Sequence, residues 1–282
     1  MSTRPILLDF SNRPELHYLA ALAGAFRAAT GDSPFFLVGA TARDLLLQYA
    51  HGINSGRKTR DVDLALMLPD WATFEAIRSR LLAGGRFSAN GTALHKLVFE
   101  GFLEVDLIPF GAIERADRSI AWPPDGEFVM TVFGFHEVFE TTLPVQLPDG
   151  EKIRIVSLPA LAVLKLLAWT ERRLTEPGKD AYDLAAILRK YLDAGNHERL
   201  YTDAARLLDE PDFDYELAGA WLLGHDMAQI LPRAARPRVA EILNREGDPH
   251  GAVLLAGDMP IDATRVLALL QSAAKGFREV TD

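Results

Sequence analysis

The stretch that decides the fold is FFLVGATARD at residues 35–44, together with DVDLAL at residues 61–66. Four apolar residues run directly into Gly39, and apolar residues recur at helical spacing over residues 41–49. This pattern predicts a strand, a tight turn and a helix, in that order. In the second segment polar and apolar residues alternate, which predicts a strand with one face in the core.

Three aspartates occupy the polar faces of two predicted strands. Period-two alternation places Asp61 and Asp63 on one face of the first strand. In the stretch EVDLI at residues 104–108, the same alternation leaves Asp106 on the polar face. If the two strands are neighbours, three carboxylates come together, and such a cluster favours a divalent cation such as Mg²⁺. The alternative is a set of solvated aspartates at an exposed strand end.

The surrounding segments predict an α+β fold. Residues 94–99 and 103–108 predict an antiparallel hairpin, and residues 145–147 and 152–156 predict another. Helical spacing covers residues 15–29, 71–82, 158–172, 181–192, 198–208, 215–230 and 263–274. We therefore predict a mixed β-sheet domain over residues 1–156, followed by an α-helical domain over residues 157–282.

Composition limits the classes of function. The 282 residues carry 30 Lys and Arg against 39 Asp and Glu, a net charge of −9, so nucleic acid binding needs a local cluster of cations. The absence of cysteine excludes disulfides, thiolate catalysis and Cys-ligated metals. The longest apolar stretch, residues 158–169, is shorter than the roughly 18 residues of a membrane span. We expect a cytoplasmic protein with no membrane association.

The turn at Gly39 is a candidate phosphate site. Glycine lets the backbone approach a ligand, and free N–H groups together with the Thr41 hydroxyl suit an anion. Arg57, Lys58 and Arg60 precede the first aspartate and place positive charge beside it, as a triphosphate or an RNA backbone requires. A plain turn followed by a solvated loop is the alternative.

A lysine within an apolar helix is a further candidate. Lys165 lies among leucines and shares a predicted stripe with Arg172, so it could reach a triphosphate. The alternative is a surface lysine whose charged end lies in water. Asp180 and Asp183 are three residues apart and therefore share a helix face, where ordinary ion pairing is their alternative role. Either aspartate could face an active site.

Together these blocks resemble a known superfamily. VGATARD at residues 38–44, DVD at residues 61–63 and VDL at residues 105–107 are similar to nucleotidyltransferases with a polymerase-β-like catalytic domain. Within that superfamily the chain resembles the AbiEii-type nucleotidyltransferases, many of which are toxins of toxin–antitoxin pairs. Their later lysine helix and Asp-x-x-Asp-Leu helix match residues 164–173 and 179–184. The resemblance therefore implies that the helical domain over residues 157–282 completes the active site. The later Arg-Arg-Asp block of the CCA-adding enzymes is not found in this sequence.

The resemblance implies transfer of a nucleoside monophosphate from an NTP to an acceptor hydroxyl. Two Mg²⁺ ions, with Mn²⁺ as the alternative, are held by Asp61, Asp63 and Asp106, which together with Lys165 and Asp183 form the implied catalytic set. The implied nucleotide contacts come from Gly39, Ala40, Thr41, Arg43, Arg60, Lys165 and Asp180. The implied acceptor is a tRNA-like RNA, and a cognate antitoxin is an implied partner. The alternatives are nucleotidylation of a protein hydroxyl and a non-catalytic nucleotide-binding protein.

Overall fold

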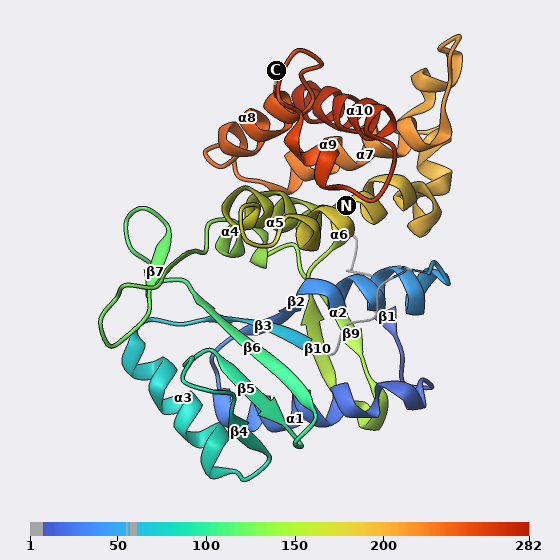
Figure 1. The fold of residues 1–282 in the computed structure, drawn as a ribbon. Helices are drawn as coiled ribbons and strands as arrows, with labels where there is room; N and C mark the ends of the chain where they lie inside the picture. The colour runs from blue at the N-terminus through green and yellow to red at the C-terminus, as the bar shows by residue number, and fades with distance from the viewer. Residues whose placement is uncertain (1–7, 55, 57–60, 282) are drawn as a thin grey trace. The chain divides into compact units, whose positions relative to one another are not determined.

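A computed structural model describes residues 8–54, 56 and 61–281 of the chain (Figure 1). The chain forms two compact units: unit 1 comprises residues 1–42 and 57–156, and unit 2 comprises residues 43–56 and 157–282. The chain therefore changes unit within helix α2 (Gly39–Asp44), again after residue 56, and a third time after Val156. Arg57, Lys58 and Arg60, which were expected beside the aspartates, lie outside the described residues.

Unit 1 is built on a mixed sheet that has, within the described residues, eight strands in the order β1-β9-β10-β2-β3-β6-β5-β4. The strands are β1 (Leu8–Asp9), β2 (Phe35–Val38), β3 (Asp61–Met67), β4 (Phe87–Ala89), β5 (Lys96–Phe99), β6 (Leu103–Phe110), β9 (Leu143–Gln146) and β10 (Lys152–Ile155). β3 pairs antiparallel with β2 and parallel with β6. Both predicted hairpins are confirmed, because β5 is antiparallel to β6 and β9 to β10.

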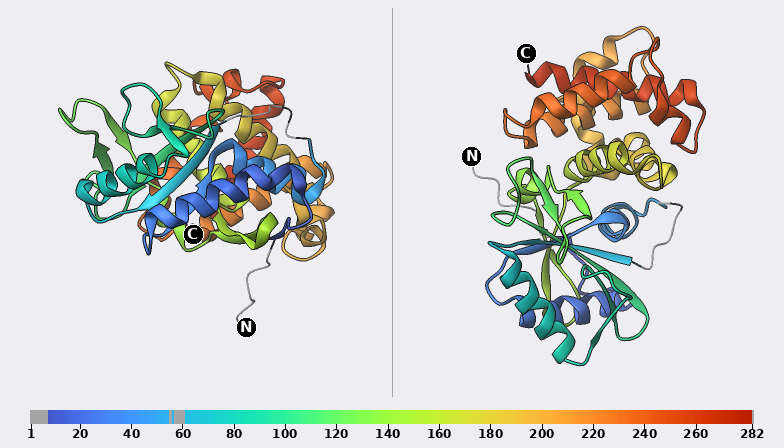
Figure 2. Two further views of the ribbon diagram at one scale, coloured as in Figure 1. Left: turned by 90° about the horizontal axis from the view of Figure 1, so that it is seen from below. Right: turned by 60° about the vertical axis from the view of Figure 1, so that its left-hand side comes forward.

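Two helices cover one face of this sheet. α1 (His17–Thr30) and α3 (Trp71–Ala83) lie on the same side of it (Figures 1 and 2). Val62 and Leu64 of β3 are buried, as the alternating pattern predicts. The aspartates of β3 occupy the alternate positions and therefore lie on the opposite face, where they are half-buried.

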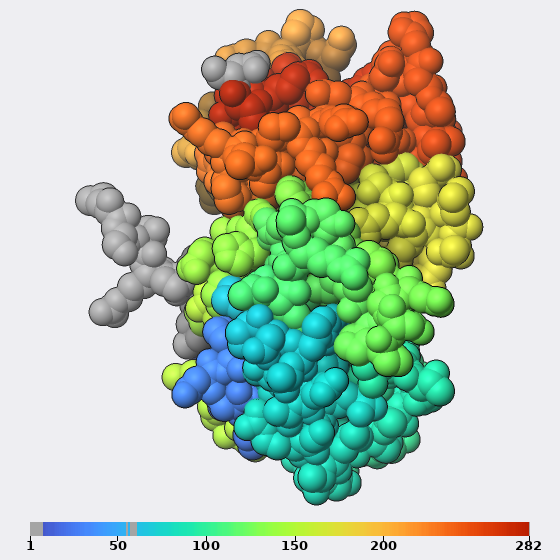
Figure 3. Space-filling model, turned by 90° about the vertical axis from the view of Figure 1, so that its left-hand side faces the viewer, coloured from blue at the N-terminus to red at the C-terminus, as the bar shows by residue number. Residues whose placement is uncertain are grey.

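A small hairpin packs against α3. β7 (Ser119–Ala121) pairs antiparallel with β8 (Val129–Thr131), and the green segment that carries them lies at the surface of unit 1 (Figure 3). The buried Trp122 ring follows β7, and its centroid lies 5.1 Å from that of Trp71 and 5.4 Å from that of Phe74. These ring contacts attach the hairpin to the start of α3. A short helix, α4 (Phe135–Phe139), follows the hairpin.

Unit 2 is helical, as predicted for the C-terminal part of the chain. Its helices are α5 (Leu158–Arg172), α6 (Pro177–Lys190), α7 (Tyr215–Ile230), α8 (Arg236–Glu246), α9 (Leu254–Asp258) and α10 (Ala263–Thr281). Glycines let α7 and α10 approach closely, because a Cβ on Gly224 would lie 1.9 Å from the Ala273 carbonyl oxygen. Within the described residues, no helix is both long and apolar enough to cross a membrane.

The segment 43–56 packs into unit 2 although it is distant in sequence. It continues α2 as a single π-helical turn, Leu45–Tyr49, whose leucines are buried. The His51 ring packs against the backbone of Gly195, where a Cβ would lie 2.7 Å from His51 Cε1. The helix predicted over residues 41–49 is therefore present, and most of it belongs to the helical unit.

One predicted helix is wrong. Residues 198–208 form two short 3₁₀ turns, His197–Tyr201 and Ala205–Asp209, in place of one α-helix. The break falls at a Thr-Asp pair, and such side chains form local hydrogen bonds that compete with the helical backbone. Asp203 accepts a hydrogen bond from Arg199 Nε at 2.7 Å. This ion pair is satisfied without a continuous helix.

Candidate active site

The turn between β2 and α2 fits closely against the first aspartate strand. Gly39 has φ +71°, a conformation that favours glycine. A Cβ here would lie 1.8 Å from Asp63 Oδ2, so the carboxylate packs directly on the glycine backbone. The buried Thr41 hydroxyl donates a hydrogen bond to the Asp61 carbonyl oxygen at 2.8 Å. This bond ties the turn to β3 and uses the hydroxyl proton that was expected to face a phosphate.

The structure brings the three predicted aspartates together on one face of the sheet. Asp63 lies opposite Asp106 in the parallel pair of β3 and β6, and all three aspartates are half-buried. Asp61 lies two residues before Asp63, and opposite it stands the exposed Glu104. Because adjacent strands are about 4.8 Å apart, this polar face concentrates negative charge.

A lysine that the sequence reasoning missed pairs with the third aspartate. Lys96 lies opposite Asp106 in the β5–β6 hairpin, and its Nζ is 3.2 Å from Asp106 Oδ2 and 3.4 Å from Oδ1. In an antiparallel hairpin with its turn at residues 100–102, residue 99 pairs with 103 and residue 96 with 106, so the predicted turn is sufficient to identify this pair. Burial lowers the pKa of the adjacent His95, against the opposing effect of the Asp106 charge. The imidazole is therefore neutral at neutral pH.

The aspartates suit a hard divalent cation in their chemistry. Carboxylate oxygens are the ligands that Mg²⁺ prefers, and clustered carboxylates are stabilised by a cation. Across the described ranges, no three Asp, Glu or His side chains are already arranged as a metal cage. Asp106 is instead engaged by Lys96. The site is thus a face of oxygen ligands in which one member forms an ion pair within the protein.

Unit 2 holds a second cluster of predicted residues, and it is buried. Lys165 lies in the middle of α5 and is only 7% exposed, which rules out the surface-lysine alternative. Its Nζ lies 2.6 Å from Asp183 Oδ2 and 3.1 Å from Asp180 Oδ1. Both aspartates are buried on α6, and Arg172 Nη2 reaches Asp180 Oδ2 at 2.7 Å. Asp180 and Asp183 therefore both face the lysine.

Arg43 extends this cluster from the other side. Its side chain is fully buried, and its guanidinium pairs with Asp183 and, at 2.7 Å, with Asp44. The result is a chain of alternating charges: Asp44, Arg43, Asp183, Lys165, Asp180 and Arg172. Because each charged side chain in this chain lies beside side chains of the opposite sign, these groups can remain ionised in a buried environment, where an unpaired charge is costly. The nucleotide contact implied for Arg43 stays a prediction, since its donors point to carboxylates of its own chain.

Sequence periodicity could not find the Arg43–Asp183 pair. The two residues are 140 positions apart and lie on α2 and α6. Periodicity assigns a residue to a face of its own element but carries no information on which distant element covers that face. The motif match identified both residues without indicating that they touch.

The chain matches a known protein family and is similar to several solved structures. A family model for the nucleotidyl transferase AbiEii toxin of a type IV TA system matches residues 20–245. The solution structure of the antibiotic-resistance factor ANT(2'')-Ia has 17% identity and a TM-score of 0.37, over 68% of this chain and 96% of that one. An antigenic nucleotidyltransferase-like protein from Paracoccidioides brasiliensis has 15% identity and a TM-score of 0.40, over 71% and 92%. JHP933 from Helicobacter pylori has 12% identity and a TM-score of 0.33, over 96% and 94%. No curated protein matches the chain.

Proposed function

The chain belongs to the AbiEii nucleotidyltransferase family and is a nucleotidyl transfer enzyme; on this premise we propose that it transfers a nucleoside monophosphate from an NTP to a hydroxyl of a tRNA-like RNA. We propose further that the reaction depends on Mg²⁺. The toxin description of the family supports a role as the toxin of a toxin–antitoxin pair, with a cognate antitoxin as partner.

The observation that carries this proposal is the register of the aspartate strands. Asp63 and Asp106 are direct neighbours on one sheet face, with Asp61 two residues away and the Gly39 turn packed against Asp63. Clustered carboxylate oxygens suit a hard divalent cation, and an inactive scaffold has no physical need for such a cluster. A nucleotide brings such a cation with its phosphates.

Each group has a defined part in the proposed reaction. Transfer forms a bond between the acceptor oxygen and the α-phosphorus and breaks the bond to pyrophosphate. In the proposed reaction Asp106 accepts the hydroxyl proton, and Lys96 Nζ donates a hydrogen bond to its carboxylate at 3.2 Å. Asp61, Asp63 and Asp106 would hold Mg²⁺, which when bound supplies positive charge to the phosphates. The backbone at Gly39 approaches Asp63, and we assign phosphate binding to this turn.

We propose that transfer needs both units. The aspartates belong to unit 1, whereas Lys165, Asp180 and Asp183 belong to unit 2. Lys165 supplies the cation proposed to stabilise charge on the leaving pyrophosphate, as one preorganised group at a phosphoryl-transfer site does. Its two aspartates fix the position of the ammonium group.

The test is a transfer assay with each α-labelled NTP, Mg²⁺ and total RNA. Asp63→Asn keeps the side-chain volume and removes a charge, so labelling should fall by at least about 10²-fold while the fold survives. Glu75→Gln is the matched control, because it removes an exposed acid from α3 on the other face of the sheet. Chelation of Mg²⁺ should abolish labelling in the wild type. Equal activity of Asp63→Asn and the wild type would disprove the proposed site.

The acceptor is identified by digestion of the labelled product. Label released by nuclease supports RNA. Label that survives nuclease and is released by protease would show that the acceptor is a protein hydroxyl and would overturn the RNA part of the proposal.

A further inference from the structure

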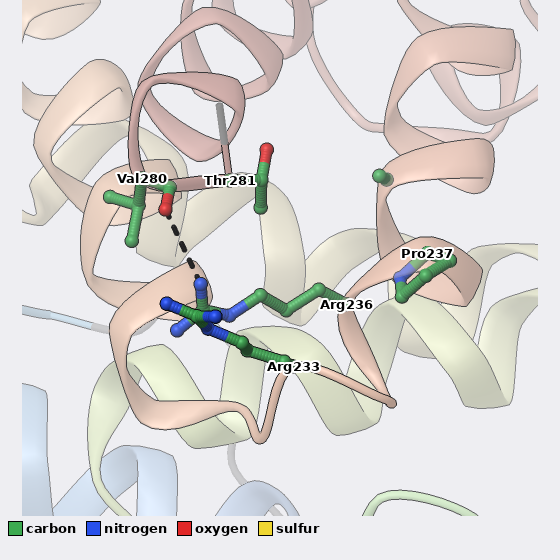
Figure 4. A pocket seen from close by; sticks show the side chains of 6 residues that line it. Arg233, Arg236, Pro237, Val280 and Thr281 are labelled. Atoms are coloured by element: carbon green, nitrogen blue, oxygen red, sulfur yellow. Dashed lines mark hydrogen bonds between the residues drawn. The ribbon is translucent and has the colours of Figure 1, made fainter.

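A cavity in unit 2 gathers positive charge apart from the residues described above. It has a volume of about 500 Å³ and lies where the start of α8 meets the end of α10 (Figure 4). It is lined by Arg233, Arg236, Pro237, Ala240, Val280 and Thr281. Among the residues that the structure describes, this lining contains two cations and no acid.

Arg236 is oriented by neutral acceptors. Its Nε donates to the Leu231 carbonyl oxygen at 3.1 Å, and its Nη1 donates to the Val280 carbonyl oxygen at 3.3 Å, the bond drawn as a dashed line in Figure 4. Carbonyl oxygens orient a guanidinium but do not neutralise its charge. The half-buried side chain therefore presents a fixed positive charge at the cavity wall.

Arg233 adds a second positive charge to the same space. Its side chain is exposed, and it forms no hydrogen bond or ion pair with any residue that the structure describes. Figure 4 shows its guanidinium extending toward that of Arg236. Two like charges that share a cavity repel each other, and an anion between them removes the repulsion.

We propose that this cavity binds a backbone phosphate of the acceptor RNA, an inference that rests on the proposed function. Guanidinium groups match the geometry of phosphate oxygens and donate two bonds at once. A chain with a net charge of −9 can hold RNA only where cations gather, and residues 232–240 contain three arginines and no acid. α8 also contacts the helix that carries Lys165, through the pair Arg238–Glu171 at 3.7 Å.

The experiment measures RNA affinity as a function of salt, without NTP or metal. The probe is unfractionated tRNA, titrated into wild type, Arg233→Ala and Arg86→Ala. Arg86 is the matched control, because it is an exposed arginine of unit 1 that already pairs with Glu100 at 2.6 Å. Arg233→Ala should reduce the salt slope by about 0.7 to 0.9 and the affinity at low salt by about fivefold to tenfold, the loss of one phosphate contact. Arg86→Ala should leave both unchanged.

A second titration distinguishes the sources of phosphate. NTP and inorganic pyrophosphate should bind Arg233→Ala as tightly as the wild type. If their affinity falls and that of tRNA does not, the cavity binds free phosphates and the proposal is overturned. It is also overturned if Arg233→Ala and Arg86→Ala behave alike, or if Arg233→Ala changes only the melting temperature. Because binding is measured without turnover, failure of the proposed transfer reaction would leave these results unchanged.

Discussion

At the scale of single residues, Gly39 is the most constrained position of the site. A Cβ there meets Asp63 Oδ2 at 1.8 Å, in a backbone conformation with φ +71°. Gly39→Ala should therefore displace the aspartate, lower the free energy of unfolding by about 1 to 3 kcal/mol, and reduce transfer more than the stability loss explains. Urea denaturation and the labelling assay measure the two effects.

Gly52→Ala is the matched control for this substitution. Gly52 has φ +69°, and a Cβ there meets nothing within 4 Å. Gly52→Ala therefore introduces the strain of a positive φ without a new side-chain contact such as that with Asp63. Equal loss of transfer in the two variants would show that the contact with Asp63 does not matter.

Lys165 is a residue whose removal should act through buried charge. Lys165→Met leaves Asp180 and Asp183 with one cation fewer and should cost about 3 to 5 kcal/mol in the free energy of unfolding. Adding Asp180→Asn to that variant should recover at least about 1 kcal/mol, because the two charges are coupled. Chemical denaturation of the wild type, Lys165→Met, Asp180→Asn and the double variant completes a double-mutant cycle, which gives the coupling free energy of the two residues. If the two substitutions change the free energy of unfolding by amounts that simply add, the two charges are not coupled and the proposed chain of ion pairs is contradicted.

At the scale of elements, α10 is fastened to the start of α7 by Arg265. Its guanidinium donates two bonds of 2.8 Å to Asp214, the N-cap of α7, and two bonds of 2.9 and 3.2 Å to Glu216. The bonds from Arg265 hold the pKa of Asp214 below its usual value, although partial burial opposes this shift. A carboxyl group with a lowered folded-state pKa stabilises the fold above its unfolded-state pKa, and this contribution is lost as the pH falls through the folded-state pKa.

Arg265→Gln should accordingly lower the free energy of unfolding by about 1 kcal/mol at pH 7. The difference from the wild type should shrink below pH ~4, the usual pKa of an aspartate. Urea denaturation between pH 3 and pH 7 measures both quantities. A difference that does not change across this range would refute the role assigned to the ion pair.

Periodicity predicted most of the elements, with identifiable exceptions. The hairpin that places Lys96 opposite Asp106 follows from the turn alone, since strand pairing next to a short turn is local. No helix was predicted over α8, because three arginines and Pro237 lie at its start and only a few apolar residues follow them. Arg199, which precedes the break at residues 202–203, pairs with Asp203 and also reaches Asp226 of α7 at 2.6 Å. Such tertiary contacts cannot be predicted from the periodicity of apolar residues in the sequence.

At the scale of the whole molecule, the sequence places a boundary after residue 156, and the structure adds the segment 43–56 to the helical unit. The strand face with its three aspartates could be predicted because alternation and motif spacing are local. The membership of residues 43–56 in unit 2 could not be predicted, because it depends on contacts between distant segments, such as those of Arg43 with Asp183 and of His51 with Gly195.

This arrangement predicts the behaviour of a split chain. Fragments 1–156 and 157–282, produced separately and mixed, should form a complex that purifies as one species, since residues 43–56 pack against the helical fragment. Arg43→Leu in the first fragment should weaken the complex by at least about 10²-fold, because Asp183 then loses a buried partner. Calorimetry measures the affinity, and Arg27→Leu, which removes an exposed cation, is the control. Fragments that do not associate would contradict the assignment of residues 43–56.

The interleaved path of the chain also constrains how genes of this kind can recombine. A crossover between two relatives at the codons for Val156 and Ser157 would join a complete sheet to a complete set of C-terminal helices. It would nevertheless separate Arg43 from the Asp183 with which it was inherited, and would leave a buried charge facing a foreign partner. Viable chimaeras therefore require either a double exchange that includes residues 43–56 or parents that share this ion pair. Selection on one buried pair thus links two gene segments that a map of domains would treat as independent.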